Sequence, residues 1–244
     1  MNQHMPLPFD ILYEDDQMIA VSKPSGMLTL PDRHDEALQS LRGILEKHYG
    51  KIFVVHRLDK DTSGVIVFAK NEGTHKYLSK LFEGREIEKR YLGIVTGKPT
   101  SDNGTIDQPI AESTTRAGAM VINKRGKASV TDYTVLQRFR TYSLLQFHIH
   151  TGRTHQIRIH CKFMGHPIVC DPLYSDEKPI LLSALKKKFK LGKDVEEERP
   201  LLNRLALHAF KLSFKTESGE SLVLEAPLPK DMAATVKQLE KTSN

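Results

Sequence analysis

The chain reads His56-Arg57-Leu58-Asp59-Lys60-Asp61-Thr62-Ser63-Gly64 immediately after the apolar run at residues 52–55. The apolar run predicts a strand, and the side chains of a strand alternate between its two faces. Arg57 and Asp59 are then expected on one face, and His56 and Leu58 on the other. A strand that carries a cation and a carboxylate into a polar turn is a common basis for a functional site. A surface ion pair beside a tight turn gives the same pattern.

Short apolar runs elsewhere predict a protein rich in strands. Residues 65–69 are continuously apolar, which is typical of a strand buried on both faces. The acidic residues 14–16 predict a hairpin turn between the first two strands. The remaining strands are expected at residues 11–13, 18–21, 91–95, 130–135, 142–147 and 210–214.

Four helices are expected where apolar residues recur every three or four positions. They cover residues 38–48, ended by Gly50, residues 77–82, ended by Gly84, residues 157–164, and residues 232–239. Thr154 is the expected N-cap of the third helix, and Gly165 its end. Because the strands cluster without regular alternation with helices, the pattern favours an α+β fold with a mostly antiparallel sheet.

Composition limits the class of protein. The chain has 244 residues, of which 39% are hydrophobic, within the range of one large domain. It has no apolar run near the roughly 20 residues that cross a bilayer, and no signal peptide is visible. Two cysteines are too few for a disulfide framework, so we expect a cytoplasmic location. The net charge of +6 favours a polyanionic partner.

The run from His56 to Gly64 resembles the catalytic motif of the RluA family of pseudouridine synthases, enzymes that convert selected uridines in RNA into pseudouridine. Cys170 is one departure from the family pattern, because relatives often carry a glycine there. Other stretches resemble family motifs in the expected order along nearly the whole chain: residues 13–16, 21–26, 89–91, 151–158, 165–168, 171–174 and 204–209.

The resemblance implies a pseudouridine synthase fold, with one mostly antiparallel mixed sheet, flanking helices and a central catalytic cleft. We expect residues 1–244 to form a single catalytic domain. Since the chain begins close to the catalytic region, we expect no separate N-terminal RNA-binding domain. The segment 178–200 is expected to be a solvated insertion, with a basic arm that touches RNA phosphates as the alternative.

The resemblance also implies the catalytic residues. Asp59 matches the essential carboxylate of the family, and its role, attack on the sugar or removal of a sugar proton, stays open. Arg153 matches the arginine that pairs with this carboxylate, since a nearby cation favours the ionised form. Tyr91 matches the tyrosine beside the target base, although its apolar neighbours are equally typical of a core strand.

Five further residues are expected to serve RNA binding. A base inside an RNA stem must be flipped out, at a cost of a few kcal/mol. Arg57 matches the family arginine that fills the vacated space, and its planar guanidinium suits that role. His56 and Thr62 flank this point. Each is expected either to contact RNA, to pack in the core or to cap the turn. His155 and Gln156 are expected to orient the loop around Arg153.

The histidines at positions 148, 150, 155 and 160 do not predict a metal site. His155 and His160 lie five positions apart, whereas ligands on one helix face are four apart. We found no cysteine or carboxylate with matching spacing. Isomerisation of uridine is neither a redox reaction nor a net hydrolysis, so we expect no cofactor and no metal.

The sequence therefore predicts a stand-alone RNA pseudouridine synthase that acts on structured ribosomal or transfer RNA. We expect a monomer without membrane or metal partners. The alternative is a non-catalytic RNA-binding or RNA-chaperone protein on the same scaffold. A nucleoside glycosidase is a third possibility, and it would release free uracil.

Overall fold

The computed structural model describes residues 7–32, 35, 37–176, 178–186, 188–190 and 197–243. It divides the chain into two compact units, which are described one at a time. The first unit comprises Met1–Lys89 and Ala209–Pro227, and the second comprises Arg90–His208 and Leu228–Asn244. Among the described residues, no helix is both long and apolar enough to span a bilayer.

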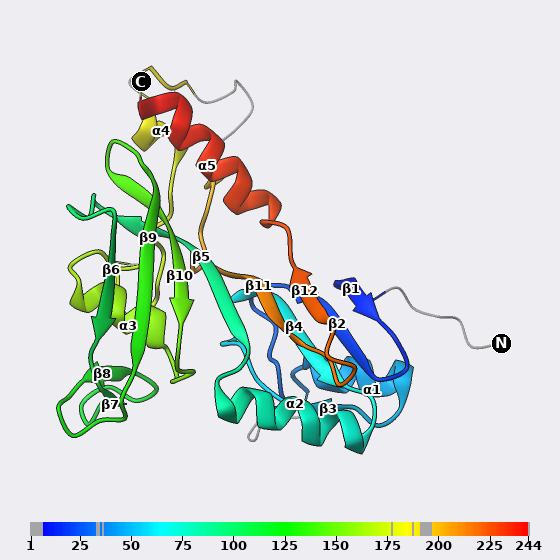
Figure 1. Ribbon diagram of the computed structural model, residues 1–244. Helices are drawn as coiled ribbons and strands as arrows, with labels where there is room; N and C mark the ends of the chain where they lie inside the picture. The colour runs from blue at the N-terminus through cyan, green and yellow to red at the C-terminus, as the bar shows by residue number, and fades with distance from the viewer. Residues whose placement is uncertain are drawn as a thin grey trace. The chain divides into compact units, whose positions relative to one another are not determined.

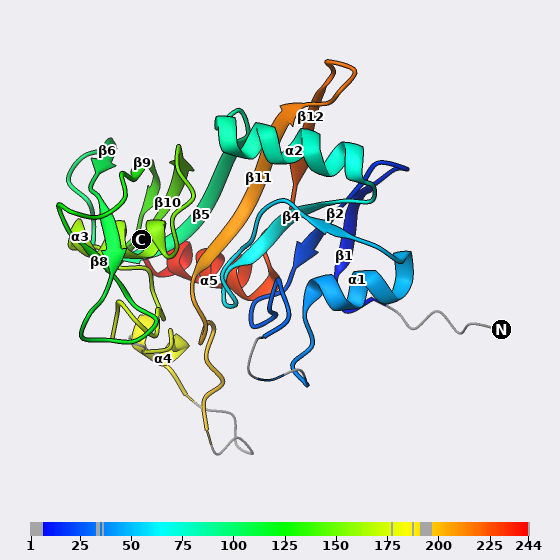
Figure 2. The ribbon, with the colours of Figure 1, turned by 90° about the horizontal axis from the view of Figure 1, so that it is seen from below.

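The first unit is built on antiparallel strand pairs. Strand β2 pairs with β1 on one side and with β4 on the other, so the three lie side by side (Figures 1 and 2). All residues of β4 are buried, as its unbroken apolar sequence predicts. The strands are β1 (Asp10–Glu14), β2 (Met18–Lys23), β3 (Phe53–Val54), β4 (Ser63–Ala69), most of β11 (Leu207–Lys215) and β12 (Ser221–Glu225).

Both helices of the first unit begin at a side-chain cap. The hydroxyl of Ser40 accepts a hydrogen bond from the backbone N–H of Gly43 at the start of α1 (Leu41–Tyr49). The carboxamide of Asn71 does the same for α2 (Glu72–Gly84). Such caps satisfy backbone donors that the first turn of a helix leaves open. Buried leucines of α2 join the apolar core beneath β2 and β4.

The second unit contains a four-stranded antiparallel arrangement in the order β5-β10-β9-β6 (Figure 1). A separate hairpin joins β7 to β8. The core packs around residues of β5 and β10. The strands are β5 (Glu88–Thr96), which begins in the first unit, β6 (Asn103–Asp107), β7 (Ile110–Glu112), β8 (Met120–Ile122), β9 (Val130–Arg138) and β10 (Tyr142–Ile149).

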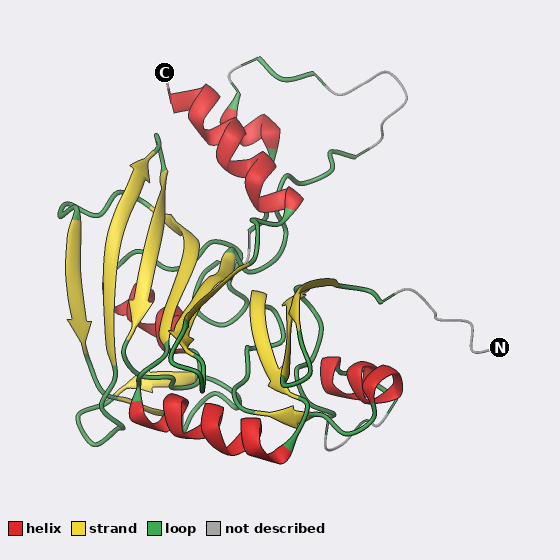
Figure 3. Ribbon diagram, turned by 45° about the vertical axis from the view of Figure 1, so that its right-hand side comes forward, coloured by secondary structure: helices red, strands yellow, loops and turns green. Residues whose placement is uncertain are grey.

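Three helices complete the second unit: α3 (Gln156–Phe163), α4 (Leu182–Leu185) and α5 (Lys230–Ser243). Helix α5 packs beside α4 (Figure 3), and its buried Met232 and Leu239 enter the core of the unit. The Arg204 guanidinium holds both carboxylate oxygens of Asp231 at 2.6 Å, which fastens the first turn of α5. Oppositely charged groups in this fork geometry form strong hydrogen bonds.

The architecture confirms the α+β class, the mostly antiparallel pairing and the four expected helices. The expected strand at residues 52–55 is confirmed for Phe53–Val54, but the expected alternation of residues 56–59 was wrong, because residues 55–59 have no regular structure. Thr154 is not the N-cap of α3, because His155 takes that position. The segment 178–200 includes α4 and the buried Ile180, and its residues 187 and 191–196 lie outside the described residues. The single-domain organisation stays a prediction.

Candidate active site

The loop between β3 and β4 carries four of the predicted site residues. Residues 55–59 have no regular structure, and the backbone N–H of Thr62 donates to the carbonyl of Asp59 at 3.1 Å to close a turn. Leu58 is buried, Arg57 is exposed and Asp59 is partly exposed. The buried leucine therefore anchors a loop whose polar residues remain accessible.

A buried lysine fixes the end of this loop. Lys23, at the end of β2, is fully buried, and its ammonium donates to the carbonyls of Pro24, Met27 and Lys60 at 3.0, 2.7 and 2.8 Å. A buried charge costs much free energy unless it is hydrogen-bonded. These three bonds compensate the charge and hold the residue that directly follows Asp59.

Two hydroxyl groups from the same N-terminal segment also hold the loop. Thr29 Oγ1 donates to the carbonyl of Leu58 at 2.9 Å and accepts from its backbone N–H at 3.3 Å. Ser25 Oγ donates to the carbonyl of Asp61 at 2.6 Å. The segment around residues 23–29 is therefore the scaffold on which the loop is built.

Gly64 allows β4 to start directly after the loop. Its φ of +121° lies in a region that side chains rarely adopt, and a Cβ there would fall on the backbone carbonyl of Ala209 in β11. Only glycine permits such a close approach of two backbones. The glycine of the motif is thus explained by packing, independently of chemistry.

His56 is a packed residue of the first unit. Its Nε2 accepts a hydrogen bond from the backbone N–H of Val67 at 3.1 Å, and its ring stacks on Phe82 with centroids 4.5 Å apart. Burial, and to a smaller extent the nearby charge of Lys89, lower the pKa of the imidazole from 6.5 to about 3. His56 is therefore neutral and joins the loop to β4.

In the second unit, Tyr91 lies near the start of β5. Its Cα partner on β10 is Phe147, and its partly buried ring packs against the apolar core of the unit. This position agrees with the strand character that its neighbours predict. It also leaves part of the ring accessible.

Arg153 lies in the loop between β10 and α3, and Gln156 organises that loop. Gln156 is only 3% exposed. Its Oε1 accepts from the Arg153 backbone N–H at 3.1 Å and from Thr151 Oγ1 at 2.7 Å. Its Nε2 donates to Val130 and Thr131 on β9, both at 2.9 Å. One buried carboxamide thereby fixes the loop to the neighbouring strand.

The Arg153 side chain lines a basic cavity. Its Nε donates to the carbonyl of Ala128 at 3.3 Å. Arg125 and Lys127 line the same cavity of about 440 Å³, together with residues of the β7–β8 hairpin. Three cationic side chains around a space of this size suit a phosphate-bearing ligand.

His155 and the segment 171–174 support the loop from the other side. His155 has a φ of +55°, and its Nδ1 is hydrogen-bonded to the Tyr174 hydroxyl at 2.9 Å. Arg158 of α3 forms a buried bidentate pair with Asp171, with both distances 2.7 Å. A fork of this kind adds geometric precision as well as energy. The arginine motif and the Asp-Pro motif are therefore parts of one assembly.

Cys170 precedes Asp171 with a φ of +56°. This left-handed conformation is easy for glycine and costly for residues with a Cβ. The departure from the family pattern thus falls on a position whose backbone favours glycine. The thiol is buried, and burial raises its pKa to about 11.

The predicted site residues divide between the two units. The first unit carries Arg57, His56, Thr62 and Asp59 on one loop, and the second carries Tyr91 on β5 and His155, Gln156 and Arg153 at one turn. The expected contact of Asp59 with Arg153 and Tyr91 stays a prediction. Lys23, Arg125 and Lys127 were not predicted to have a role. The basic run at residues 124–127 was a visible signal for the last two.

Comparison with known proteins supports one family. The family model described as RNA pseudouridylate synthase matches residues 17–163. The chain is 34% identical to "Uncharacterized RNA pseudouridine synthase YlyB" of Bacillus subtilis, over 97% of this chain and 74% of that protein. It is 35% identical to "Ribosomal large subunit pseudouridine synthase D" of Vibrio cholerae, over 93% and 69%.

A solved structure supports the same family. "Human RNA Pseudouridylate Synthase Domain Containing 4" aligns with a TM-score of 0.72 and 28% identity, over 94% of this chain and 92% of that one. The family match covers more than half of the chain, and the relatives align over nearly all of it. The chain therefore belongs to the RNA pseudouridylate synthase family, within its RluA branch, and is an isomerase, a pseudouridine synthase.

Proposed function

We propose that this pseudouridine synthase isomerises specific uridines in ribosomal or transfer RNA, with Asp59 as the catalytic carboxylate. The relative from Vibrio cholerae is named for the large ribosomal subunit, which favours ribosomal RNA. The net charge of +6 favours a polyanion, because cationic side chains that contact phosphates release counterions. We further propose that the enzyme is a monomer and acts in the cytoplasm.

The proposed chemistry needs one reactive carboxylate on a rigid support. The bond between uracil and ribose breaks, the base turns, and a new bond forms through a ring carbon. Asp59 suits this task because its turn is fastened by the Lys23 ammonium and by the hydroxyls of Ser25 and Thr29. A functional group held by such a support keeps the geometry that its chemistry requires.

We assign the other two catalytic roles to the second unit. Arg153 offsets the repulsion between the Asp59 carboxylate and RNA phosphates. Tyr91 stacks on the target base, and its hydroxyl assists removal of the proton from the ring carbon. The support for Arg153 is its place in a cavity that Arg125 and Lys127 also line, which suits an RNA phosphate.

The residues expected to serve RNA binding have two kinds of role: contact with the RNA, and positioning of a loop. Arg57 is exposed and lines a second cavity of about 460 Å³ together with Lys60, so we assign it to the space left by the extruded base. Buried Thr62 and packed His56 hold the Asp59 loop. His155 and Gln156 hold the Arg153 loop through the hydrogen bonds described above.

The observation that carries the proposal is the turn that presents Asp59, because its backbone carbonyls accept hydrogen bonds from Lys23, Ser25 and Thr29. We expect Asp59→Asn to abolish pseudouridine formation and to keep RNA affinity, since the substitution removes the charge with little change of shape. Asp61→Asn is the matched control in the same turn and should keep most of the activity. Turnover by Asp59→Asn at the wild-type rate contradicts the assignment.

The substrate is tested separately. Pseudouridines in cellular RNA should be mapped with and without this protein, and the sites that disappear identify the target. Loss of sites from ribosomal or transfer RNA supports the proposal. Unchanged pseudouridines in both classes of RNA contradict it.

A further inference from the structure

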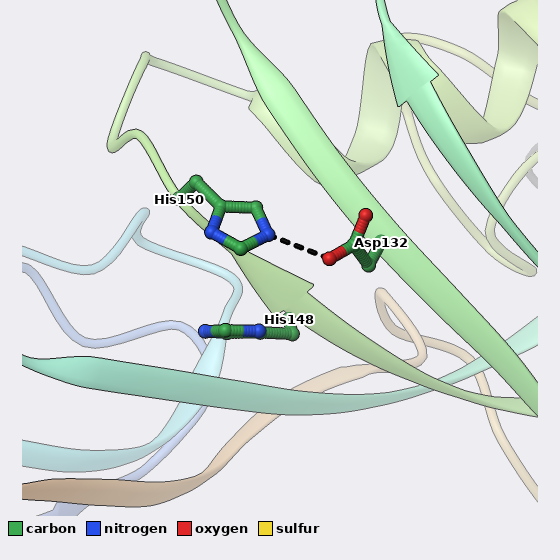
Figure 4. A group of neighbouring side chains, drawn as sticks. All are labelled: Asp132, His148 and His150. Atoms are coloured by element: carbon green, nitrogen blue, oxygen red, sulfur yellow. Dashed lines mark hydrogen bonds and ion pairs between the residues drawn. The ribbon is translucent and has the colours of Figure 1, made fainter.

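Two histidines and an aspartate gather on one face of strands β9 and β10 (Figure 4). His148 and His150 are alternate residues of β10, so they point to the same face. Asp132 on β9 is the Cα partner of His148. One ligand atom from each of the three side chains lies within 4.8 Å of the other two. All three residues belong to the second unit.

The cluster is already held together by hydrogen bonds. His150 Nε2 lies 2.6 Å from Asp132 Oδ2 (Figure 4), and the rings of His148 and His150 are 4.4 Å apart. The hydroxyl of Thr105 on β6 donates to the other carboxylate oxygen of Asp132 at 2.6 Å. A partner that orients a ligating carboxylate in this way is a regular part of protein metal sites.

The cluster is accessible to solvent. The side chains of His150 and Asp132 are 42% and 39% exposed. An ion can therefore reach the cluster from solvent, and water can occupy a remaining coordination position.

We propose that Asp132, His148 and His150 bind one divalent transition-metal ion of the Zn²⁺ type, with solvent completing the coordination. Two imidazoles and one carboxylate form a ligand set that Zn²⁺ uses in proteins. Mg²⁺ and Ca²⁺ prefer oxygen ligands and are not expected to bind here. The ion replaces the hydrogen bond between His150 and Asp132, which needs only small side-chain movements. The proposal does not depend on the proposed role of Asp59.

The site differs from the pattern that the sequence analysis considered. The spacing of the histidines, compared with that of ligands on a helix, predicted no metal site. On a strand, a separation of two residues brings side chains together. The third ligand then comes from the neighbouring strand, sixteen residues before His148. The spacing of residues along the sequence does not reveal this contact, because the contact depends on the register in which β9 and β10 pair.

The first test is metal binding by the full, untagged chain after treatment with EDTA. Titration with Zn²⁺ at neutral pH should give one saturable equivalent, whereas Mg²⁺ should give none. His148→Ala, His150→Ala and Asp132→Ala should each weaken the site at least about tenfold, and Thr105→Val by a similar or smaller factor. His48→Ala in α1 is the matched control and should bind as the wild type does.

A spectroscopic readout separates ligation from general loss of structure. With Cu²⁺ as the probe, electron paramagnetic resonance of the wild type should show coupling to two imidazole nitrogens. Either histidine variant should show one, and circular dichroism should report an unchanged fold. A wild-type protein without saturable Zn²⁺ binding, or without the two-nitrogen signal, overturns the proposal. So does affinity that both histidine variants leave unchanged.

Discussion

Gln156 and the backbone of Arg153 are hydrogen-bonded in both directions, once through the Gln156 side chain and once through its backbone. Gln156 Oε1 accepts from the Arg153 N–H at 3.1 Å, and the Arg153 carbonyl accepts from the Gln156 N–H at 3.1 Å. Gln156 is buried, whereas Arg153 lines a cavity. A buried residue thus sets the position of one that lines a cavity.

Gln156→Ala should therefore lower the activity of the folded protein as well as its stability. The change leaves buried groups of Val130, Thr131 and Thr151 without their carboxamide partner, at about 1–3 kcal/mol each if no water replaces it. Misplacement of Arg153 by about 1 Å should reduce kcat/KM about 100-fold. Gln137→Ala on β9 is the control. Activity that falls only in proportion to the unfolded fraction contradicts this role.

Lys23→Met should weaken both the fold and catalysis. The substitution removes the ammonium that three carbonyls share, including that of Lys60 next to Asp59. We expect the free energy of unfolding in urea to fall by about 3 kcal/mol. Hydrogen bonds to charged groups contribute about 1.5–3 kcal/mol each, but removal of the ammonium also removes the cost of burying its charge. The exposed Lys51, paired with Glu72 on the surface, is the control. Lys51→Met should lower the free energy of unfolding by less than about 1 kcal/mol. An equal loss of stability from both variants argues against the role of Lys23 in holding the Asp59 loop.

His56 should make the fold less stable in mild acid. The imidazole has a pKa of about 3 in the folded protein and an ordinary value of 6.5. Between these values the unfolded chain binds a proton that the folded chain does not, so the contribution to stability is complete above pH 6.5 and is lost as pH falls. Its slope is at most about 1.4 kcal/mol per pH unit.

The measurement is urea unfolding at several pH values for the wild type and His56→Gln. Glutamine carries no charge at any pH and can accept a hydrogen bond. The variant should show a shallower pH dependence than the wild type. Identical slopes contradict the buried, neutral state of His56.

Position 170 should tolerate glycine better than a β-branched residue. Cys170→Gly relieves a left-handed conformation that costs about 1–2 kcal/mol, but it loses the buried thiol, so we expect a small net change in stability. Cys170→Val places a β-branched side chain where positive φ is an outlier. The melting temperature should therefore be clearly lower for the valine variant. Equal melting temperatures would show that the backbone shifts to relieve the strain.

The parts that the sequence predicted are those with strong local signals. The apolar run of β4 and the spacing of Leu78 and Leu81 in α2 carry their own periodicity. The short hairpin β7–β8 was not predicted, because it depends on distant partners such as Tyr174, whose hydroxyl accepts from the Met120 N–H at 2.7 Å. Tertiary contacts of this kind leave no local periodicity.

The candidate site shows the same contrast between residues that a sequence motif indicates and residues whose role depends on tertiary contacts. The resemblance of the motifs indicated Asp59, Arg57 and Arg153, and it placed Lys23 in a family segment without a role. The function of Lys23 depends on three carbonyls, and a carbonyl has no sequence signature. Likewise, His148 and His150 approach Asp132 only through strand pairing.

The close approach of Gly64 to Ala209 has a consequence for the order in which the enzyme matures on the ribosome. The lysine anchor and the loop that it holds lie within the first quarter or so of the chain, and both emerge early in translation. The backbone against which Gly64 packs is synthesised only after more than half of the chain has followed. A nascent chain that stops before β11 thus carries the Asp59 loop without the strand against which Gly64 packs, so we expect no catalysis before β11 has been synthesised.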